Sequence, residues 1–250
     1  MTALLELKGV SRSFGGIAAV NNVTASFQKG EIVGLIGPNG AGKTTLVNLV
    51  TGVHHIDAGE IVFDGKRING LKSHRISRLG VARTFQVVQP FPEMTVADNV
   101  AAGALFAGGA GSVAAAREEA QQHLEFVGLG AMADTLASAL TLPDRKRLEL
   151  AKSLAIKPKL LMLDEVNAGL NLREIDDALK LIRAIADTGV TIVIIEHVIK
   201  VVVSLSDRLL VLHHGELIAD GPPDDVVKDP QVVEAYLGAR FAQRMRGGTA

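Results

Sequence analysis

The sequence contains no cysteine. A chain without cysteine has neither a disulfide framework nor a cysteine-ligated metal site, and both classes are therefore excluded. The absence also fits a protein that works in a reducing cytosol.

The sequence also has no excess of charge of either sign, because its 26 lysines and arginines nearly balance its 27 aspartates and glutamates. The net charge is −1. A nearly neutral chain has no overall field that would attract nucleic acid, so we expect no nucleic-acid partner. With 48% hydrophobic and 21% charged residues, the 250-residue chain is typical of a globular protein with a sizeable core.

No hydrophobic run is long enough to predict a membrane span. The longest uncharged stretch, Asn99 to Ala116, is dominated by glycine and alanine, and the apolar run TIVIIEHVIKVVVSLS is interrupted by Glu196, His197 and Lys200. The first residues, MTALLELKGVSRSF, have no basic region that leads into an apolar stretch, so we expect no signal peptide. These patterns predict a soluble protein, which could still dock on a membrane partner.

Strand and helix patterns alternate along most of the chain. EIVGLIG, KLLMLD and VTIVIIE predict buried strands, and KTTLVNLVTG and REIDDALKLIRAIADTG predict helices between strands. This alternation is typical of a parallel sheet covered by helices. LLELKGVSRSF, VNNVTASF and GEIVFDGKRI predict further strands, the last as a hairpin around Asp64-Gly65.

The composition changes from about Phe91 to Ala139, where alanine and glycine dominate and strand patterns vanish. This stretch predicts an inserted helical subdomain. Its apolar positions at helical spacing are Val113, Ala116, Ala120, Leu124 and Val127.

The segment GLIGPNGAGKTTL carries a glycine-rich phosphate loop. It reads Gly37-x-x-x-x-Gly42-Lys43-Thr44, with a strand pattern before it and a helix pattern after it, as the motif requires. Glycines let backbone N–H groups turn toward a phosphate, and the following helix points its positive end at the same place. Lys43 would bind the β- and γ-phosphates, Thr44 would offer its hydroxyl to Mg²⁺, and Thr45 would add a donor.

A second apolar strand, in KLLMLDE, ends in the two carboxylates Asp164 and Glu165. The carboxyl end of a parallel strand is where ligands bind in such sheets. Asp164 would hold the magnesium ion, and Glu165 is placed to orient or deprotonate an attacking water. The competing interpretation is a strand end that only begins a turn.

Two further polar residues are candidates. VTIVIIEHV ends in Glu196-His197, where the histidine would contact the γ-phosphate, although a lone histidine is usually structural. VARTFQ ends in Gln86, just before the helical insertion, where an amide could reach magnesium or the attacking water. Considered alone, Gln86 would be a surface amide.

Taken in order, these segments resemble the nucleotide-binding subunit of an ABC transporter, over about residues 4–238. GPNGAGKTT matches Walker A, LLMLDE Walker B, TFQ the Q-loop, NAGLN the D-loop and IEH the H-loop. The resemblance implies an α/β P-loop NTPase with a mixed, largely parallel core sheet, an antiparallel β subdomain and an inserted α-helical subdomain. It implies a nucleotide-binding core at 4–86 and 155–238, a helical subdomain with the signature segment at 87–154, and a basic tail at 239–250.

Finer details resemble the ATPases of branched-chain, or hydrophobic, amino-acid uptake systems: SFGGIAAVNNV, VARTFQVVQPFPEMTVADNV and VVEAYLG. Phe14 then matches the aromatic residue that stacks on adenine, although its pattern alone indicates a half-buried strand residue. The resemblance implies ATP and Mg²⁺ as cofactors. The implied nucleotide-binding residues are Phe14, Gly37, Asn39, Gly40, Ala41, Gly42, Lys43, Thr44 and Thr45. The implied magnesium ligands are Thr44, Gln86 and Asp164, and the implied catalytic residues are Glu165, His197 and Gln86.

The same resemblance implies partners and a location. Two such subunits face head to tail as a homodimer or heterodimer, and each ATP lies between one subunit's phosphate loop and the signature motif, LSGGQ, of the other. A membrane permease would dock between the Gln86 segment and the helical insertion, with a periplasmic substrate-binding protein as an indirect partner. The protein would sit peripherally on the cytoplasmic face of the inner membrane.

The signature position departs from LSGGQ, because it holds Leu140-Thr141-Leu142-Pro143-Asp144. The hydroxyl is kept as Thr141, but both glycines are gone and Pro143 has no N–H to offer. Thr141 and Asp144 have capping-box spacing, with Asp a weaker reciprocal partner than Glu or Gln, and Pro143 falls in the tolerant first turn. We therefore expect the helix to satisfy its own N-terminal donors and to present a weak signature to a partner's ATP.

A smaller departure is Asn171, where many relatives have the D-loop aspartate; Asn171-x-x-Glu174 also fits a helix N-cap. Among function classes, a P-loop kinase would not carry the helical insertion, Gln86 and His197 in this order. A soluble ABC-type ATPase would usually need a tandem domain, a long coiled coil or a basic surface. A transport ATPase explains the chain best. Its cargo rests on likeness alone, because the same architecture also serves urea, aromatic acids and lipopolysaccharide export.

Overall fold

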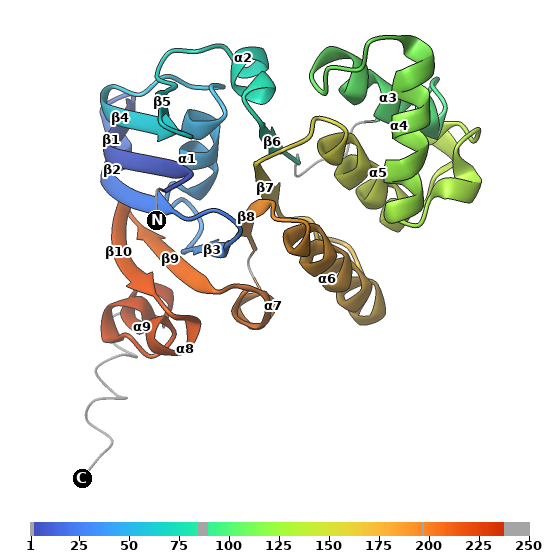
Figure 1. Ribbon diagram of the computed structural model, residues 1–250. Coiled ribbons are helices and arrows are strands. Elements are labelled where there is room, and N and C mark those ends of the chain that lie inside the picture. The colour runs from blue at the N-terminus through green and yellow to red at the C-terminus, as the bar shows by residue number, and fades with distance from the viewer. Residues whose placement is uncertain (1–2, 85–89, 197, 238–250) are drawn as a thin grey trace. The chain divides into compact units, whose positions relative to one another are not determined.

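The computed structural model describes residues 3–84, 90–196 and 198–237, so Gln86 and His197 lie outside the described residues. The chain divides into two compact units, residues 1–71 with 191–250 and residues 72–190. The first unit joins the two ends of the chain, and the second is one continuous segment (Figure 1).

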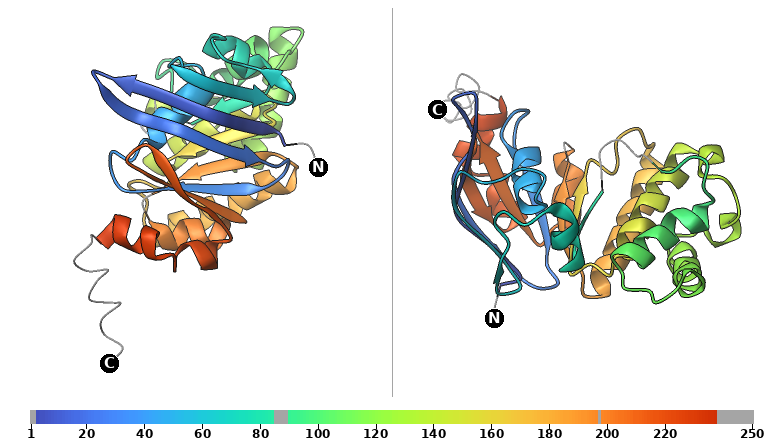
Figure 2. Two further views of the ribbon diagram at one scale, coloured as in Figure 1. Left: turned by 90° about the vertical axis from the view of Figure 1, so that its left-hand side faces the viewer. Right: turned by 90° about the horizontal axis from the view of Figure 1, so that it is seen from above.

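The first unit contains an antiparallel sheet that the sequence predicts as a set of alternating strands. Its order is β2 (Ile17–Phe27), β1 (Leu5–Phe14), β4 (Ala58–Phe63) and β5 (Lys66–Arg67). β1 and β2 form the long hairpin drawn in blue in the left view of Figure 2. Asp64 and Gly65, which join β4 to β5, both have positive φ, as in the tight hairpin turn that Asp-Gly favours.

A second sheet of the first unit carries the phosphate loop. Its strands, in order, are β10 (Glu216–Gly221), β9 (Arg208–His213), β3 (Ile32–Ile36) and β8 (Thr191–Ile195). β3 runs parallel to β8 and β9, whereas β10 runs antiparallel to β9. Every residue of β3 and β8 is buried, which explains why both strands read as unbroken apolar runs in the sequence.

The helices of the first unit begin with the one that follows the phosphate loop. They are α1 (Lys43–Val50), α7 (Ile199–Leu205), α8 (Pro223–Val226) and α9 (Pro230–Leu237). α7 packs on β3, and α8 and α9 pack against β10. The end of the described chain is thereby placed beside the sheet that carries the loop.

The second unit combines a parallel strand pair with helices. β6 (Val81–Arg83) pairs with β7 (Leu160–Asp164), with Val81 opposite Leu160. The helices are α2 (Ser73–Arg78), α3 (Val96–Phe106), α4 (Val113–Phe126), α5 (Leu142–Leu154) and α6 (Leu172–Asp187). None of the helices described in either unit is long and apolar enough to cross a lipid bilayer.

α3, α4 and α5 pack on one another, and Figure 1 shows them gathered in one part of the second unit. The predicted helical face of α4 is confirmed at Ala116, Ala120 and Leu124, which are all 0% exposed. Val113 differs, with 59% exposure, because it is the first residue of α4 and its side chain points back past the helix end.

The compact units are divided differently from the subdomains that the resemblance implies. The resemblance implies a helical subdomain at 87–154, and the compact second unit spans 72–190 and also includes β6, β7 and α6. The physical reason is that β6 and β7 pair directly while flanking the helical segment in the sequence. The expected boundaries of the family domain stay a prediction.

Gly34 in β3 offers a test of this packing. A Cβ atom there would lie closer than 3.0 Å to side-chain atoms of Val202, Leu209 and Ser206. We expect Gly34→Ala to lower the free energy of unfolding by about 1–3 kcal/mol, because the added methyl overpacks the core. Urea denaturation measures the change.

Gly111→Ala is the matched control, because its Cβ would meet nothing within 4 Å and its φ is not left-handed. Its effect should stay within about 0.5 kcal/mol. An equal loss of stability in both variants would contradict the packing argument.

Candidate nucleotide-binding site

The phosphate loop joins β3 to α1, and its two end glycines are held in close contact with neighbouring backbone. Gly37 and Gly42 have φ values of 151° and 104°. A Cβ atom on Gly37 would lie closer than 3.0 Å to the carbonyl oxygen of Leu212, and one on Gly42 would approach the carbonyl oxygen of Ala19 in the same way. The loop is therefore pressed against β9 and β2, and glycine is required at both ends.

Lys43 is enclosed by this loop. It is 6% exposed, and its ammonium donates hydrogen bonds to the carbonyl oxygens of Gly37 (2.7 Å) and Pro38 (3.1 Å). Lys43 also begins α1, which carries no acidic residue in its first turn. The ammonium and the helix N-terminus together give a positively charged site whose chemistry fits the phosphate chain of a nucleotide.

The other predicted phosphate-binding residues lie on the same loop and helix turn. Asn39, Gly40 and Thr44 are exposed, and Thr45 is half-buried. Ala41 is buried, and its carbonyl oxygen accepts a hydrogen bond from the backbone N–H of Gly215 (3.0 Å) in the β9–β10 turn. The exposed hydroxyl of Thr44 is thus open to a ligand, while Ala41 ties the loop to the sheet.

Phe14, the predicted adenine-stacking residue, ends β1 with its side chain 39% exposed. Its ring meets that of His54 edge-on, with centroids 5.3 Å apart, and the Arg12 guanidinium lies 4.8 Å from its centroid. Arg12 also pairs with Asp57 at 2.6 Å. The backbone N–H of Ser13, helped by Arg12, holds the pKa of Asp57 below its usual value. Phe14 is therefore an exposed, braced ring, and adenine stacking stays a prediction.

In the second unit, Asp164 ends β7, as the sequence predicts, and it is only 4% exposed. Its carboxylate forms an ion pair with Arg83 of β6 (3.2 Å), and its backbone N–H donates to the Thr84 hydroxyl (3.2 Å). Burial lowers the pKa of the Arg83 guanidinium, an effect that the Asp164 charge opposes. Sequence reasoning missed Arg83, although a lone arginine within the apolar GVARTF was a visible signal.

Glu165 follows with an unusual backbone. Its φ is +50°, which is uncommon for a residue other than glycine. Its side chain is half-buried, and its carbonyl oxygen accepts a hydrogen bond from Lys146 of α5 (3.4 Å). The turn after β7 is thus held by the helix of the signature segment, a contact that no sequence pattern indicates.

The N-terminus of α5 is capped by a side chain of its own segment, as predicted. Thr141 is the N-cap: its hydroxyl oxygen accepts from the backbone N–H of Asp144 (3.4 Å), and its hydroxyl donates to the Asp144 carboxylate (2.5 Å). Leu142 and Pro143 occupy the first turn. The expected reciprocal bond differs, because the short Asp144 side chain binds the hydroxyl of Thr141 and not its backbone N–H.

Asn171 has the N-cap role that its spacing allows. Its side chain accepts from the backbone N–H of Glu174 (3.1 Å), and the Glu174 carboxylate accepts from the backbone N–H of Asn171 (2.8 Å). Both bonds of a capping box are therefore present at the start of α6.

A magnesium site stays a prediction, and the described residues that would supply its oxygen donors belong to both units. Within the described part of the chain, no group of three or more His, Asp or Glu side chains is arranged to hold a metal. The candidate protein ligands are the exposed Thr44 hydroxyl in the first unit and the Asp164 carboxylate in the second. Hard oxygen donors in small number suit Mg²⁺, which keeps waters and substrate phosphates as its other ligands.

Comparison with known proteins decides the family. The family model described as ABC transporter matches residues 20–168, which include both the phosphate loop and Asp164. The chain belongs to the ABC transporter family. A second model, described as branched-chain amino acid ATP-binding cassette transporter, matches residues 216–242 of this ABC ATPase.

Relatives match the ABC ATPase over most of its length. It is 39% identical to the high-affinity branched-chain amino acid transport ATP-binding protein BraF of Pseudomonas aeruginosa and 41% identical to LivG of Escherichia coli, over 94% of this chain and 98% of each relative. The crystal structure of the ADP conformation of MJ1267, an ATP-binding cassette of an ABC transporter, matches with a TM-score of 0.86 and 32% identity, over 95% of this chain and 100% of that one. The expected fold class is thereby confirmed.

The Arg83–Asp164 pair can be tested by stability. We expect Arg83→Met in this ABC ATPase to lower the free energy of unfolding by about 3 kcal/mol, because it leaves a buried carboxylate without its guanidinium partner. Urea denaturation of the variant and the wild-type chain measures the difference.

The matched control is the double variant Arg83→Met/Asp164→Asn, in which neither position of the pair carries a charge. It should unfold at a higher urea concentration than Arg83→Met alone. A double variant that is no more stable than the single one would show that the loss in Arg83→Met does not come from an unpartnered carboxylate.

Proposed function

We propose that this ABC ATPase binds and hydrolyses ATP to drive uptake of branched-chain or other hydrophobic amino acids through a separate membrane permease. The observation that carries the nucleotide part is the Lys43 ammonium enclosed by a glycine loop at the start of a helix without acidic residues. The transport functions named for BraF and LivG, together with the family match at residues 216–242, support the cargo.

Each residue has a chemical task in this proposal. Lys43 and the loop amides bind the terminal phosphates, Thr44, Asp164 and Gln86 hold Mg²⁺, and Phe14 stacks on adenine. Bound Mg²⁺ neutralises charge that develops on the phosphate oxygens. Glu165 orients or deprotonates the attacking water, and His197 contacts the γ-phosphate.

The proposed working unit is larger than one chain. Two ABC ATPase subunits, identical or related, face head to tail on the cytoplasmic face of the inner membrane and dock on permease subunits. A periplasmic binding protein delivers the amino acid on the other side. Purification of the native complex, followed by identification of its membrane and binding-protein subunits, tests this assembly and its cargo together. A complex that instead contains permeases for urea, aromatic acids or lipopolysaccharide would leave the proposed ATPase role unchanged. It would show that the proposed amino-acid cargo is wrong.

Glu165→Gln tests the hydrolytic part. The variant keeps the shape of the side chain but loses its basicity, so we expect ATP turnover to fall by about 10²–10⁴-fold while bound ATP persists. Turnover assays and a count of retained nucleotide measure the two effects. Glu118→Gln, an exposed change on α4, is the control and should hydrolyse ATP at the wild-type rate. Wild-type turnover in Glu165→Gln would remove Glu165 from the mechanism.

The signature segment yields a second test. The self-capped start of α5 should present a weak signature in trans, so replacing residues 141–144 by Ser-Gly-Gly-Gln should raise ATP-driven dimerisation or turnover. Light scattering and phosphate release measure these changes. Thr141→Ser is the control, because it keeps the hydroxyl and the following Pro143. If the four-residue replacement changes neither property, the segment already works as it stands.

A further inference from the structure

The start of α5 contacts the loop between β7 and α6, residues 165–171, at two places within the second unit. The Lys146 ammonium donates a hydrogen bond to the carbonyl oxygen of Glu165 (3.4 Å). Leu142 packs on Gly169, where a Cβ atom would lie 3.0 Å from the Leu142 Cδ2 atom. Leu142 and Lys146 are four residues apart, so one face of α5 makes both contacts.

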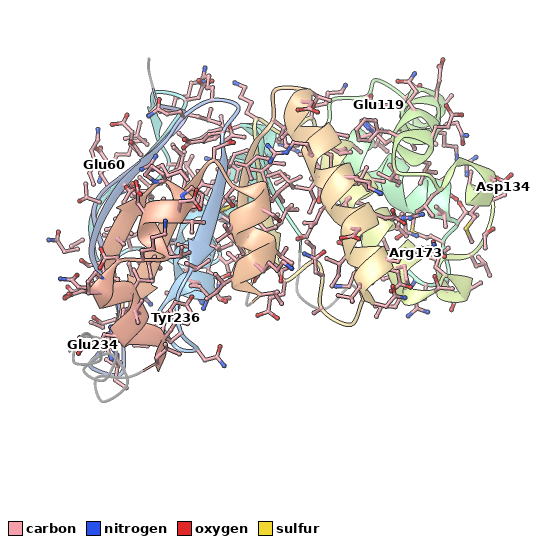
Figure 3. The ribbon with its side chains drawn as sticks, turned by 90° about the horizontal axis from the view of Figure 1, so that it is seen from below. Glu60, Glu119, Asp134, Arg173, Glu234 and Tyr236 are labelled. Carbon is pink, nitrogen blue, oxygen red and sulfur yellow. The ribbon has the colours of Figure 1, made fainter. Side chains whose placement is uncertain are left out.

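A small cavity of about 40 Å³ lies beside the Lys146 contact. Lys146 of α5 lines it together with Val166, the residue directly after Glu165. Residues of α6 also line it, and Figure 3 labels Arg173 in the first turn of that helix. Most of the lining is aliphatic, and the bond from Lys146 is partly buried, so it is partly shielded from competition by water.

The Glu165 carbonyl oxygen is held by two donors. Besides the Lys146 ammonium, the backbone N–H of Ala168 donates to it (3.2 Å). Glu165 has φ +50°, a left-handed conformation that a residue with a side chain keeps only where neighbouring contacts hold it. Because the backbone conformation sets the direction of the Cα–Cβ bond, contacts that fix this backbone also direct the Glu165 carboxylate.

We propose that Lys146 is a positioning residue for ATP hydrolysis, whose ammonium holds the backbone of Glu165 so that the carboxylate is directed at the attacking water. This inference rests on the proposed function, in which Glu165 orients or deprotonates that water. Lys146 acts through Glu165 and not on the nucleotide. The helix that carries the signature segment thereby also serves the general base of its own chain.

Lys146→Met in the full-length protein removes the ammonium and keeps an unbranched side chain. We expect kcat for ATP hydrolysis to fall by about fivefold to tenfold, because the Glu165 carbonyl loses a donor and its carboxylate is less often well directed. The Kd for Mg·ATP should change by less than about twofold, because the phosphate loop is untouched. Phosphate release and calorimetry measure the two quantities.

Two single variants serve as controls. Arg147→Met removes a cation at the next position of α5 from a side chain that lines the same cavity, and its kcat should stay within about twofold of the wild type. Lys146→Arg keeps a cationic donor and should retain at least about half of the wild-type kcat.

A double variant shows whether Lys146 acts through Glu165. In the Glu165→Gln background the carboxylate is already absent, so adding Lys146→Met should lower the residual turnover by less than about twofold. Single-turnover phosphate release measures these slow rates. An equal fold loss in both backgrounds would show that Lys146 only stabilises α5, and would overturn the inference.

A kcat loss that is confined to Lys146→Met, restored by Lys146→Arg and absent in the Glu165→Gln background supports the inference. Unchanged kcat in Lys146→Met, equal losses in Lys146→Met and Arg147→Met, no recovery in Lys146→Arg, or a loss of affinity as large as the loss of kcat each overturn it while leaving ATP hydrolysis by the wild type intact. A wild-type chain that hydrolyses no ATP, or full turnover in Glu165→Gln, overturns the proposed mechanism and the inference with it.

Discussion

The hydrogen bonds from the Lys43 ammonium to the carbonyl oxygens of Gly37 and Pro38 are the interaction around which the first unit is organised. A buried cation requires fixed acceptors, and the loop is fixed by several elements: β9 against Gly37, β2 against Gly42, and the β9–β10 turn at Ala41. This explains why a parallel core is joined to antiparallel strands here. They supply the backbone surfaces that hold a glycine loop around a charge.

The second unit uses different means to hold its polar groups. Asp164 is buried with Arg83, and the helices that begin at Leu142 and Leu172 each have an N-cap side chain from the preceding residue. Capping satisfies N–H groups that would otherwise seek an outside acceptor. The first turns of α5 and α6 therefore each have a backbone N–H that is satisfied by a side chain of the same segment.

The sequence predicts those features that depend on short-range chemistry. The phosphate loop, the Asp64-Gly65 turn, the place of Asp164 at a strand end and the caps at Thr141 and Asn171 all follow from neighbouring residues and their conformational preferences. Contacts that join distant segments could not be predicted in this way. Arg83 meets Asp164 across 81 positions, and the backbone N–H of Gly215 reaches the carbonyl oxygen of Ala41 from a distant part of the chain. Such pairs are decided by the topology of the fold, which periodicity does not encode.

The left-handed backbone of Glu165 has a consequence for the evolution of the chain. A conformation at φ +50° favours glycine over glutamate by about 1–2 kcal/mol, so the carboxylate is kept at a cost in conformational energy. Variants selected only for thermal tolerance would drift toward glycine here and lose the acid group. In the proposed mechanism, this position therefore gives up conformational stability for a carboxylate that acts on water.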